Sequence, residues 1–347
     1  MRKTAMLTAL CFCVSFLFML QGCKGQETPA PEPPEPETAT AADYFPITEN
    51  TRYVYEGEGS EYASYTVYND YTTQSEVQQR VDNGGTVAAR VITVSDGKVT
   101  QTYSSGEVYY RENCLGKTTV EEVLLADPIE AGTEWTLSDG RSRKIRGTAV
   151  AVSTPAGDYE AVEVVTETED GTDTRYYAKD VGHIKTVFAS NDFTVTSTLA
   201  AIESNRALNQ TVRFYYPDVD AETIYYLDRE IAFETNDVTK DELAASYKEV
   251  PAGVGKVLSE GTAINSLALD EDNIPHIDLS RAFLTEMNAG SGYEAMILTC
   301  IADTVAGYYT TDKVILTVEG EPYESGHFSF AEGETVSADF DAAVKLP

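Results

Sequence analysis

Side chains that could carry out acid–base or metal chemistry are few in this sequence, and they are widely separated. The three histidines, His183, His276 and His327, lack the short spacings of metal-binding motifs such as H-E-x-x-H. His276 stands two residues before Asp278 in an alternating segment, so the two could form a surface His–Asp pair. An ordinary exposed strand face is the alternative, and we favour it. The histidines therefore predict neither a metal site nor a catalytic residue.

A second candidate for chemistry is the serine–lysine spacing at residues 95–98. Ser95 and Lys98 have the S-x-x-K spacing of penicillin-binding enzymes, in which the serine begins a helix. Here the intervening Asp96-Gly97 pair favours a hairpin turn, so catalysis is not expected. The sequence also has no G-x-S-x-G elbow, phosphate-binding loop or G-x-G-x-x-G motif. We predict that the protein is not an enzyme and uses no cofactor.

Two acidic clusters, at residues 218–222 and 270–273, offer oxygen ligands of the kind that calcium prefers. Neither cluster has the central glycine and terminal glutamate of an EF-hand loop. Charged runs of this length are usually solvated turns, and we favour that interpretation over weak calcium binding.

The composition of the chain excludes several classes of protein. Its 347 residues include 25 basic and 57 acidic ones, and the formal net charge of −32 argues against nucleic-acid binding because phosphates repel an acidic surface. A hydrophobic content of 42% is ordinary for a globular protein and fits neither a disordered chain nor a polytopic membrane protein. The length favours two domains.

The first 22 residues have the features of a secretory signal. Two basic residues precede a short apolar run, which ends in Leu-Gln-Gly-Cys at residues 20–23. This ending resembles the lipobox of bacterial lipoproteins, and the resemblance implies cleavage before Cys23 and lipidation of that residue. A plain signal peptide or membrane anchor is the alternative. We therefore expect a lipoprotein signal peptide at 1–22 and an anchor on the extracytoplasmic face of the cell membrane.

Residues 23–43 are rich in proline and glutamate and contain almost nothing that a core could bury. We predict an extended tether, which at roughly 3 Å per residue would hold the folded part on the order of 60 Å from the bilayer. Beyond the tether only two cysteines remain, Cys114 and Cys300, one in each half of the chain. We predict that both are buried free thiols rather than a disulfide.

Residues 44–204 are predicted to form an antiparallel β domain. Turn signals such as Asp96-Gly97 recur at short intervals and separate stretches of β-branched and aromatic residues. Because no long helical period occurs here, the expected fold is a meander that forms one large curved sheet. Its concave, tyrosine-lined face would either bind an apolar ligand or be a filled core, and we favour the core.

Residues 205–347 are predicted to form an α+β domain with a mixed sheet and two helices on one face. Residues 239–242 and 291–294 both match the capping box, which marks a helix start. In the second helix, Ile297, Ile301 and Val305 recur at spacings of four, so this stripe should pack on the sheet.

Five segments of this half resemble, in order, the GerMN domain of sporulation and spore-germination proteins. They are residues 212–218, 277–280, 288–294, 300–309 and 314–327, and together they span most of residues 209–335. Residues 247–253 depart from the family's usual sequence after the first helix. The resemblance implies an extracytoplasmic, often lipid-anchored domain that acts through protein or cell-wall contacts. It implies no established catalytic residues.

One basic cluster stands out against the acidic composition. Arg141, Arg143, Lys144 and Arg146 fall within six residues on or beside a predicted strand. They would either pair across strands with Glu163, Glu167 and Glu169 or bind teichoic acid, a lipid headgroup or an acidic partner. We favour the pairing.

The sequence therefore predicts a lipid-anchored interaction or structural protein of the cell envelope. Its expected partners are envelope proteins or a cell-wall polymer, and the link to sporulation or germination rests on the resemblance. The alternative is an extracytoplasmic lipoprotein that binds a small ligand or lipid on the concave face of the β domain. A cell-wall hydrolase is the third and least favoured hypothesis.

Overall fold

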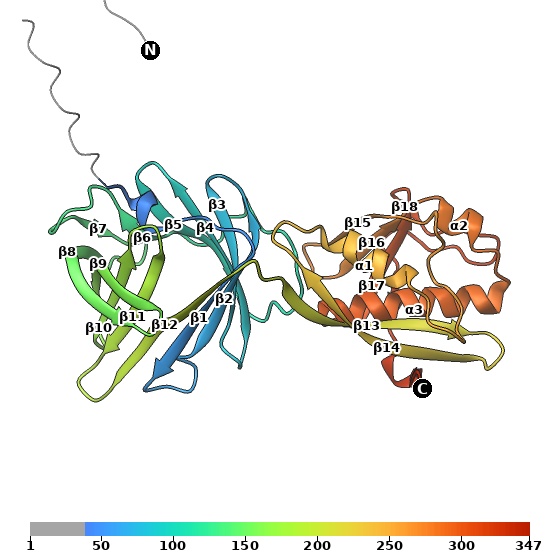
Figure 1. The fold of residues 1–347 in the computed structure, drawn as a ribbon. Coiled ribbons are helices and arrows are strands. Elements are labelled where there is room, and N and C mark those ends of the chain that lie inside the picture. The colour runs from blue at the N-terminus through green and yellow to red at the C-terminus, as the bar shows by residue number, and fades with distance from the viewer. Residues whose placement is uncertain (1–38) are drawn as a thin grey trace, which may run out of the picture. The chain divides into compact units, whose positions relative to one another are not determined.

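The computed structural model describes residues 39–347 (Figure 1). The expected signal peptide at 1–22, the lipidation site Cys23 and most of the tether at 23–43 lie outside the described residues. Among the helices of residues 39–347, none has both the length and the hydropathy needed to span a bilayer.

The first half of the described chain is a single antiparallel sheet of 12 strands, which confirms the predicted fold. Hairpins connect most consecutive strands, and β1 pairs with β12 in the middle of the sheet. Asp96 and Gly97 both have positive φ in the turn after β4, as a tight hairpin requires. Ser95 and Lys98 therefore flank a turn and not a helix start. The strands are β1 (Thr51–Glu58), β2 (Tyr65–Thr72), β3 (Glu76–Asp82), β4 (Val87–Ser95), β5 (Lys98–Ser105), β6 (Glu122–Ala126), β7 (Glu134–Thr136), β8 (Ser142–Thr154), β9 (Gly157–Glu167), β10 (Thr172–Ala178), β11 (Gly182–Ala189) and β12 (Thr194–Ser204).

This sheet curls until the strands at its two ends approach each other (Figure 1). Trp135 of β7 and Arg143 of β8 both donate to the Val123 carbonyl of β6, at 3.0 and 2.8 Å. The space between the two ends is filled by apolar side chains from both, and the short helix η1 (Ala41–Tyr44) adds Ala41 to this core. The concave face is thus largely a packed interior.

The second half has the predicted α+β composition, with its strands divided between two sheets. β13 pairs with β14, and β14 also pairs in parallel with β20, while β16 and β17 are parallel neighbours in the other sheet. A short third helix, α2, adds to the two expected. The elements are β13 (Leu208–Asp218), β14 (Thr223–Phe233), α1 (Thr239–Lys248), β15 (Ile264–Leu269), β16 (Pro275–Leu279), α2 (Ala282–Glu286), α3 (Ser291–Tyr309), β17 (Lys313–Val318), β18 (Glu321–Pro322), β19 (Thr335–Ser337), η2 (Phe340–Ala342) and β20 (Val344–Lys345).

Helix α3 forms the centre of this half, as its sequence period predicts. Ile297, Ile301 and Val305 are all buried in the core, where they pack with residues of the sheets. The predicted capping boxes, however, are wrong. Each helix begins at the serine or threonine itself, so the N-caps are Val238 and Gly290, and neither makes a side-chain cap.

Glu294 illustrates why the capping pattern fails. Its buried carboxylate accepts a hydrogen bond from the Tyr323 hydroxyl at 2.7 Å and lies 2.6 Å from Nδ1 of His327. Burial alone would raise its pKa, but hydrogen bonds from Ser325, His327 and Tyr323 lower the pKa overall. The side chain is therefore held by a distant loop and is not available to cap the first turn of α3.

Residues 39–347 form one compact unit, and a buried arginine joins its two halves. Arg111, between β5 and β6, is fully buried, and its guanidinium lies 3.5 Å from the buried carboxylate of Asp70. It also donates to the carbonyls of Asp70, Glu234 and Asp237 at 3.0, 3.1 and 3.3 Å. The division into domains at 44–204 and 205–347 remains a prediction.

The two remaining cysteines are buried free thiols, as predicted. In the part of the chain that the structure describes, Cys114 and Cys300 form no disulfide, and burial raises the pKa of both thiols above its usual range. Neither is suited to nucleophilic chemistry at neutral pH.

Candidate functional site

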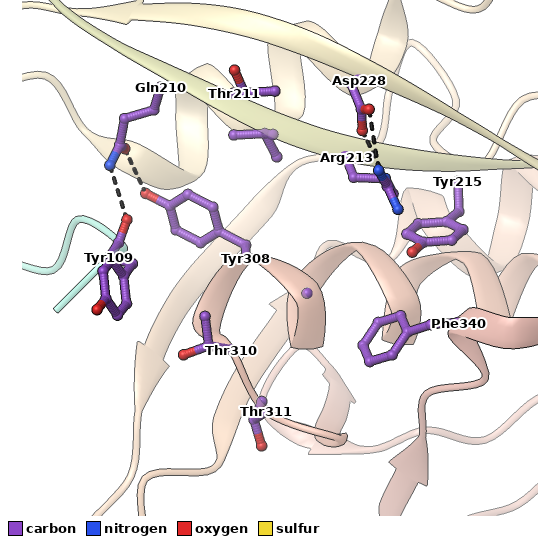
Figure 2. Close-up of a pocket in the computed structure, with 12 residues that line it drawn as sticks. Tyr109, Gln210, Thr211, Arg213, Tyr215, Asp228, Tyr308, Thr310, Thr311 and Phe340 are labelled. Atoms are coloured by element: carbon purple, nitrogen blue, oxygen red, sulfur yellow. Dashed lines mark hydrogen bonds and ion pairs between the residues drawn. The ribbon is translucent and has the colours of Figure 1, made fainter. Parts of the chain in front are cut away.

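An open groove of about 680 Å³ lies between β13 and the C-terminal end of α3 (Figure 2). Tyr109 stands at one end and is 41% exposed, while Phe340 stands at the other and is 39% exposed. Four consecutive residues of β13, 210–213, line the groove. Because side chains alternate between the two faces of a strand, a run of this kind indicates that the groove follows the strand's edge. The lining consists of Tyr109, Gln210, Thr211, Val212, Arg213, Tyr215, Asp228, Gly307, Tyr308, Thr310, Thr311 and Phe340.

The edge of β13 that faces this groove is open. Among the described strands, β13 pairs only with β14. Backbone groups in an antiparallel strand point alternately toward and away from the partner strand. Those of Tyr215 point away, because its N–H donates to Thr304 of α3 at 3.2 Å and its carbonyl accepts from Tyr247 at 2.8 Å. Thr211 and Arg213 lie four and two residues before Tyr215, so their backbone groups also point away from β14. Within residues 39–347, their backbone N–H and C=O groups meet no such partner.

The ends of the groove are held in place by polar contacts. Gln210 donates from Nε2 to the Tyr109 carbonyl at 3.0 Å and accepts from the Tyr308 hydroxyl at 3.4 Å (Figure 2). The Tyr308 hydroxyl in turn accepts the backbone N–H of Arg111 at 2.9 Å. Burial raises the pKa of Tyr308 far above its usual value, so the phenol stays neutral. This wall is rigid and uncharged.

The charged groups of the groove neutralise each other. Arg213 makes two hydrogen bonds to Asp228, at 2.7 and 3.1 Å, and its guanidinium lies over the ring of Tyr226, 4.0 Å from the centroid. The hydrogen bond from Arg213 lowers the pKa of Asp228, which keeps the pair ionised. None of the side chains lining the groove forms a nucleophile–base pair. An open strand edge beside such a groove is suited to binding an extended chain.

Comparison with known families identifies this half of the chain. Residues 213–324 match the family model Germane, described as sporulation and spore germination. Residues 213–324 are a Germane domain. Residues 213–218 of β13 and all of α3 belong to it, whereas residues 210–212, Tyr109 and Phe340 of the groove lie outside the match.

Solved structures give weaker likenesses. The tandem GerMN domains of the sporulation protein GerM from Bacillus subtilis share 19% identity over 38% of this chain and 46% of that chain, with a TM-score of 0.30. The first GerMN domain of GerM shares 18% over 38% of this chain and 98% of that one, with a TM-score of 0.29. A protein with a YmcC-like fold from Bacteroides fragilis shares 16% over 46% of this chain and 98% of that one, with a TM-score of 0.31. No curated protein matches the chain.

A buried acid of the Germane domain positions the end of the groove at Phe340, which lies beyond the matched residues. Asp303 of α3 is fully buried, and its carboxylate accepts the backbone N–H of Asp339 at 2.7 Å, next to Phe340. Its second oxygen has no hydrogen-bond partner within residues 39–347. Burial raises the pKa of Asp303 to about 6. Sequence reasoning did not single out this residue, because its burial depends on the segment after β19.

The three histidines lie at separate places and form no common site. His183 lies on the concave face of the β sheet, 2.8 Å from the hydroxyl of Thr186. His276 and Asp278 do not pair directly, because each contacts the hydroxyl of Thr317, at 3.1 and 2.7 Å. His327 contacts Glu294, as described above. Across residues 39–347, no three His, Cys, Asp or Glu side chains are grouped so that they could hold a metal ion.

The arginines of the basic cluster each contact a different acidic residue. Arg146 makes a bidentate contact with Glu163 at 2.6 Å, which confirms the predicted cross-strand pairing for that residue. Arg143 is buried and donates to Thr166 and Glu122 at 2.8 Å. Arg141 pairs with Asp139 in the preceding turn. These three arginines therefore present no continuous basic surface.

The two acidic clusters form turns. Asp218 accepts the backbone N–H groups of Asp220 and Ala221, each at 3.1 Å. Asp270 likewise accepts those of Asp272 and Ile274, at 2.9 and 2.8 Å. Aspartate side chains commonly form turns in this way. The observation agrees with the interpretation of both clusters as turns.

Proposed function

We propose that the protein is a lipid-anchored, non-enzymatic interaction protein on the extracytoplasmic face of the cell membrane. Its Germane domain would dock an extended segment of another envelope protein along the open edge of β13. The lipobox-like residues 20–23 support the anchor, and the Germane family supports a role in sporulation or germination. The observation that carries the docking proposal is that the N–H and C=O groups of Thr211 and Arg213 in the groove have no partner in the described part of the chain.

An open strand edge recognises extended peptides through main-chain hydrogen bonds. The two edge residues offer two N–H donors and two C=O acceptors, which a short antiparallel or parallel strand can satisfy. Tyr109 and Phe340 at the ends of the groove supply apolar area for the side chains of that strand, as aromatic residues commonly do at interfaces.

Charge favours a basic partner segment. The chain carries 57 acidic and 25 basic residues, and Arg213, the one basic side chain that lines the groove, is neutralised by Asp228. A basic segment would be attracted over the whole approach, whereas an acidic polymer would be repelled. We therefore favour a protein segment over an anionic wall polymer.

The substitution Thr211→Pro tests the mode of docking. Proline would remove only the outward N–H of residue 211 and leave the ladder to β14 intact, as Pro217 does at the same phase of the strand. Thr211→Ala, which keeps the N–H, is the matched control. We expect Thr211→Pro to abolish recovery of the partner from crosslinked cells and Thr211→Ala to preserve it. Recovery that is equal in both variants would contradict strand addition.

A further inference from the structure

A small polar cavity of about 180 Å³ lies on the concave face of the 12-stranded sheet. Phe45 and Leu124 form apolar parts of its wall, while Arg90, Arg175 and Tyr65 form polar parts. A smaller cavity of about 30 Å³ lies beside it, and Arg90, Phe45 and His183 line both. The concave face is therefore neither a fully filled core nor an apolar ligand site. The sequence analysis did not predict the polar lining of this cavity.

Hydrogen-bond donors without partners converge on this cavity. Arg90 donates through Nε to Gln79 at 3.0 Å, but within residues 39–347 its two terminal nitrogens have no partner. The hydroxyl groups of Tyr65 and Tyr177 and the side-chain amide of Gln101 are also without partners among the described residues. Tyr177 is only 2% exposed as a residue, and it lines the cavity. These groups line the cavity and are free to donate to a bound molecule.

The charges around the cavity do not balance. Arg175 pairs with Glu122 and Asp173 at 3.3 and 3.1 Å, and Glu122 also pairs with Arg143 at 2.8 Å. Arg90 makes no ion pair within residues 39–347. Of these residues, Arg90, Arg175 and Glu122 line the cavity, which leaves one surplus positive charge.

His183 adds no charge to this balance. It lies deep in the sheet, and burial lowers its pKa to about 3, with smaller contributions from the charges of Arg175 and Arg90. The imidazole is therefore neutral at physiological pH. The same burial raises the pKa of Tyr65 to about 12, so this phenol keeps its proton and remains a donor.

We propose that this cavity binds a small carboxylate with a short apolar or aromatic body. The planar fork of Arg90 matches a carboxylate, and one negative charge would balance the surplus positive charge. Tyr65 and Tyr177 would donate to the same group, and Phe45 and Leu124 would contact the apolar body. The volume is below that of pockets for drug-sized ligands, which limits the ligand to about the size of a single aromatic ring. This site is independent of the groove on β13.

Calorimetric titration of the full-length protein in detergent with acetate and benzoate tests the proposal. Benzamide, which has the shape of benzoate without its charge, is the control ligand. Arg90→Gln should weaken benzoate binding roughly 10- to 100-fold, the loss expected for a charge-assisted hydrogen bond. Arg52→Gln, which removes an exposed arginine paired with Glu203 on β1, should bind like the wild type.

Three results would overturn the proposal. They are no binding of either carboxylate to the wild type, equal binding of benzoate and benzamide, and equal affinity in Arg90→Gln and the wild type. If Arg90→Gln does not fold, Arg90→Lys decides the question, because lysine keeps the charge but loses the fork. Binding by Arg90→Lys about 10-fold weaker than that of the wild type would support the proposal, and unchanged binding would refute it.

Discussion

Replacing Arg111 by methionine should destabilise the protein more than replacing any exposed arginine. The guanidinium is fully buried, donates to three backbone carbonyls and lies 3.5 Å from Asp70, which is itself fully buried. It also lies over the rings of Tyr71 and Phe233, 4.8 and 4.5 Å from their centroids. Methionine fills much of the volume but leaves the carbonyls unpaired, and leaves Arg80 as the remaining cation beside Asp70.

The cost follows from the buried groups that lose a partner, which are the three carbonyls and the Asp70 oxygen that Arg111 contacts. Removing one member of a buried ion pair typically costs about 3–5 kcal/mol, against a total stability of about 5–15 kcal/mol. The matched control is Arg213→Met, which breaks a pair with Asp228 in which both side chains are at least one-third exposed. We expect this control to cost about 0–1 kcal/mol.

Urea unfolding followed by two probes measures both effects. The single tryptophan, Trp135, reports the first half of the chain, and the circular dichroism of the α-helices within residues 39–347 reports the second half. The two transitions should coincide in the wild type and separate in Arg111→Met, because Arg111 joins the halves. A loss of less than about 1 kcal/mol in Arg111→Met, equal to that in Arg213→Met, would refute the assignment.

Three further predictions concern the anchor, the core and a buried acid. Cys23→Ala should release the protein from the membrane fraction or leave it as an unprocessed precursor, as immunoblots of cell fractions would show. Mature protein that stays membrane-bound would exclude the lipid anchor at Cys23. Ile301→Ala should lower the unfolding free energy by about 2–5 kcal/mol, whereas Ser291→Ala, which removes no capping bond, should change it by less than about 0.5 kcal/mol; equal small shifts in thermal melts would contradict the core assignment. Because the pKa of Asp303 rises from 3.8 to about 6 on folding, its contribution to stability is full below the lower value and is lost as the pH rises through the higher one. Asp303→Asn should therefore stabilise the protein relative to the wild type at neutral pH, and its melting temperature should vary less with pH between these two values. Melting temperatures of variant and wild type that change in parallel across this pH range would contradict the prediction.

The parts of the fold that sequence analysis predicted depend on local signals. Asp96-Gly97 specifies a tight turn through its own backbone, and the stripe of Ile297, Ile301 and Val305 specifies a buried helix face through its period. The capping box at residues 291–294 failed because the Glu294 carboxylate bonds to Tyr323, which lies 29 residues further along the chain. Local patterns can be overridden wherever a distant residue offers a buried side chain a better partner.

The groove and the cavity could not be predicted for the same reason. Tyr109 and Gln210 are 101 residues apart in sequence, and their contact at one end of the groove depends on the packing of both halves. At Arg90, nothing in the neighbouring residues indicates that its terminal nitrogens would face a cavity and not a carboxylate. Of the basic cluster, only the pairing of Arg146 with Glu163 followed from strand adjacency.

Photo-crosslinking in intact cells tests the central claim most directly. A photoreactive phenylalanine derivative replaces Tyr109, which is 41% exposed at the end of the groove. In a control it replaces Tyr62, which lies in the β1–β2 hairpin and is more accessible, at 56%. We predict one protein adduct, identifiable by mass spectrometry, that forms from position 109, is absent from position 62 and disappears when Thr211→Pro is added. Absence of any adduct from position 109, or an adduct that persists with Thr211→Pro, would contradict docking on the open edge of β13.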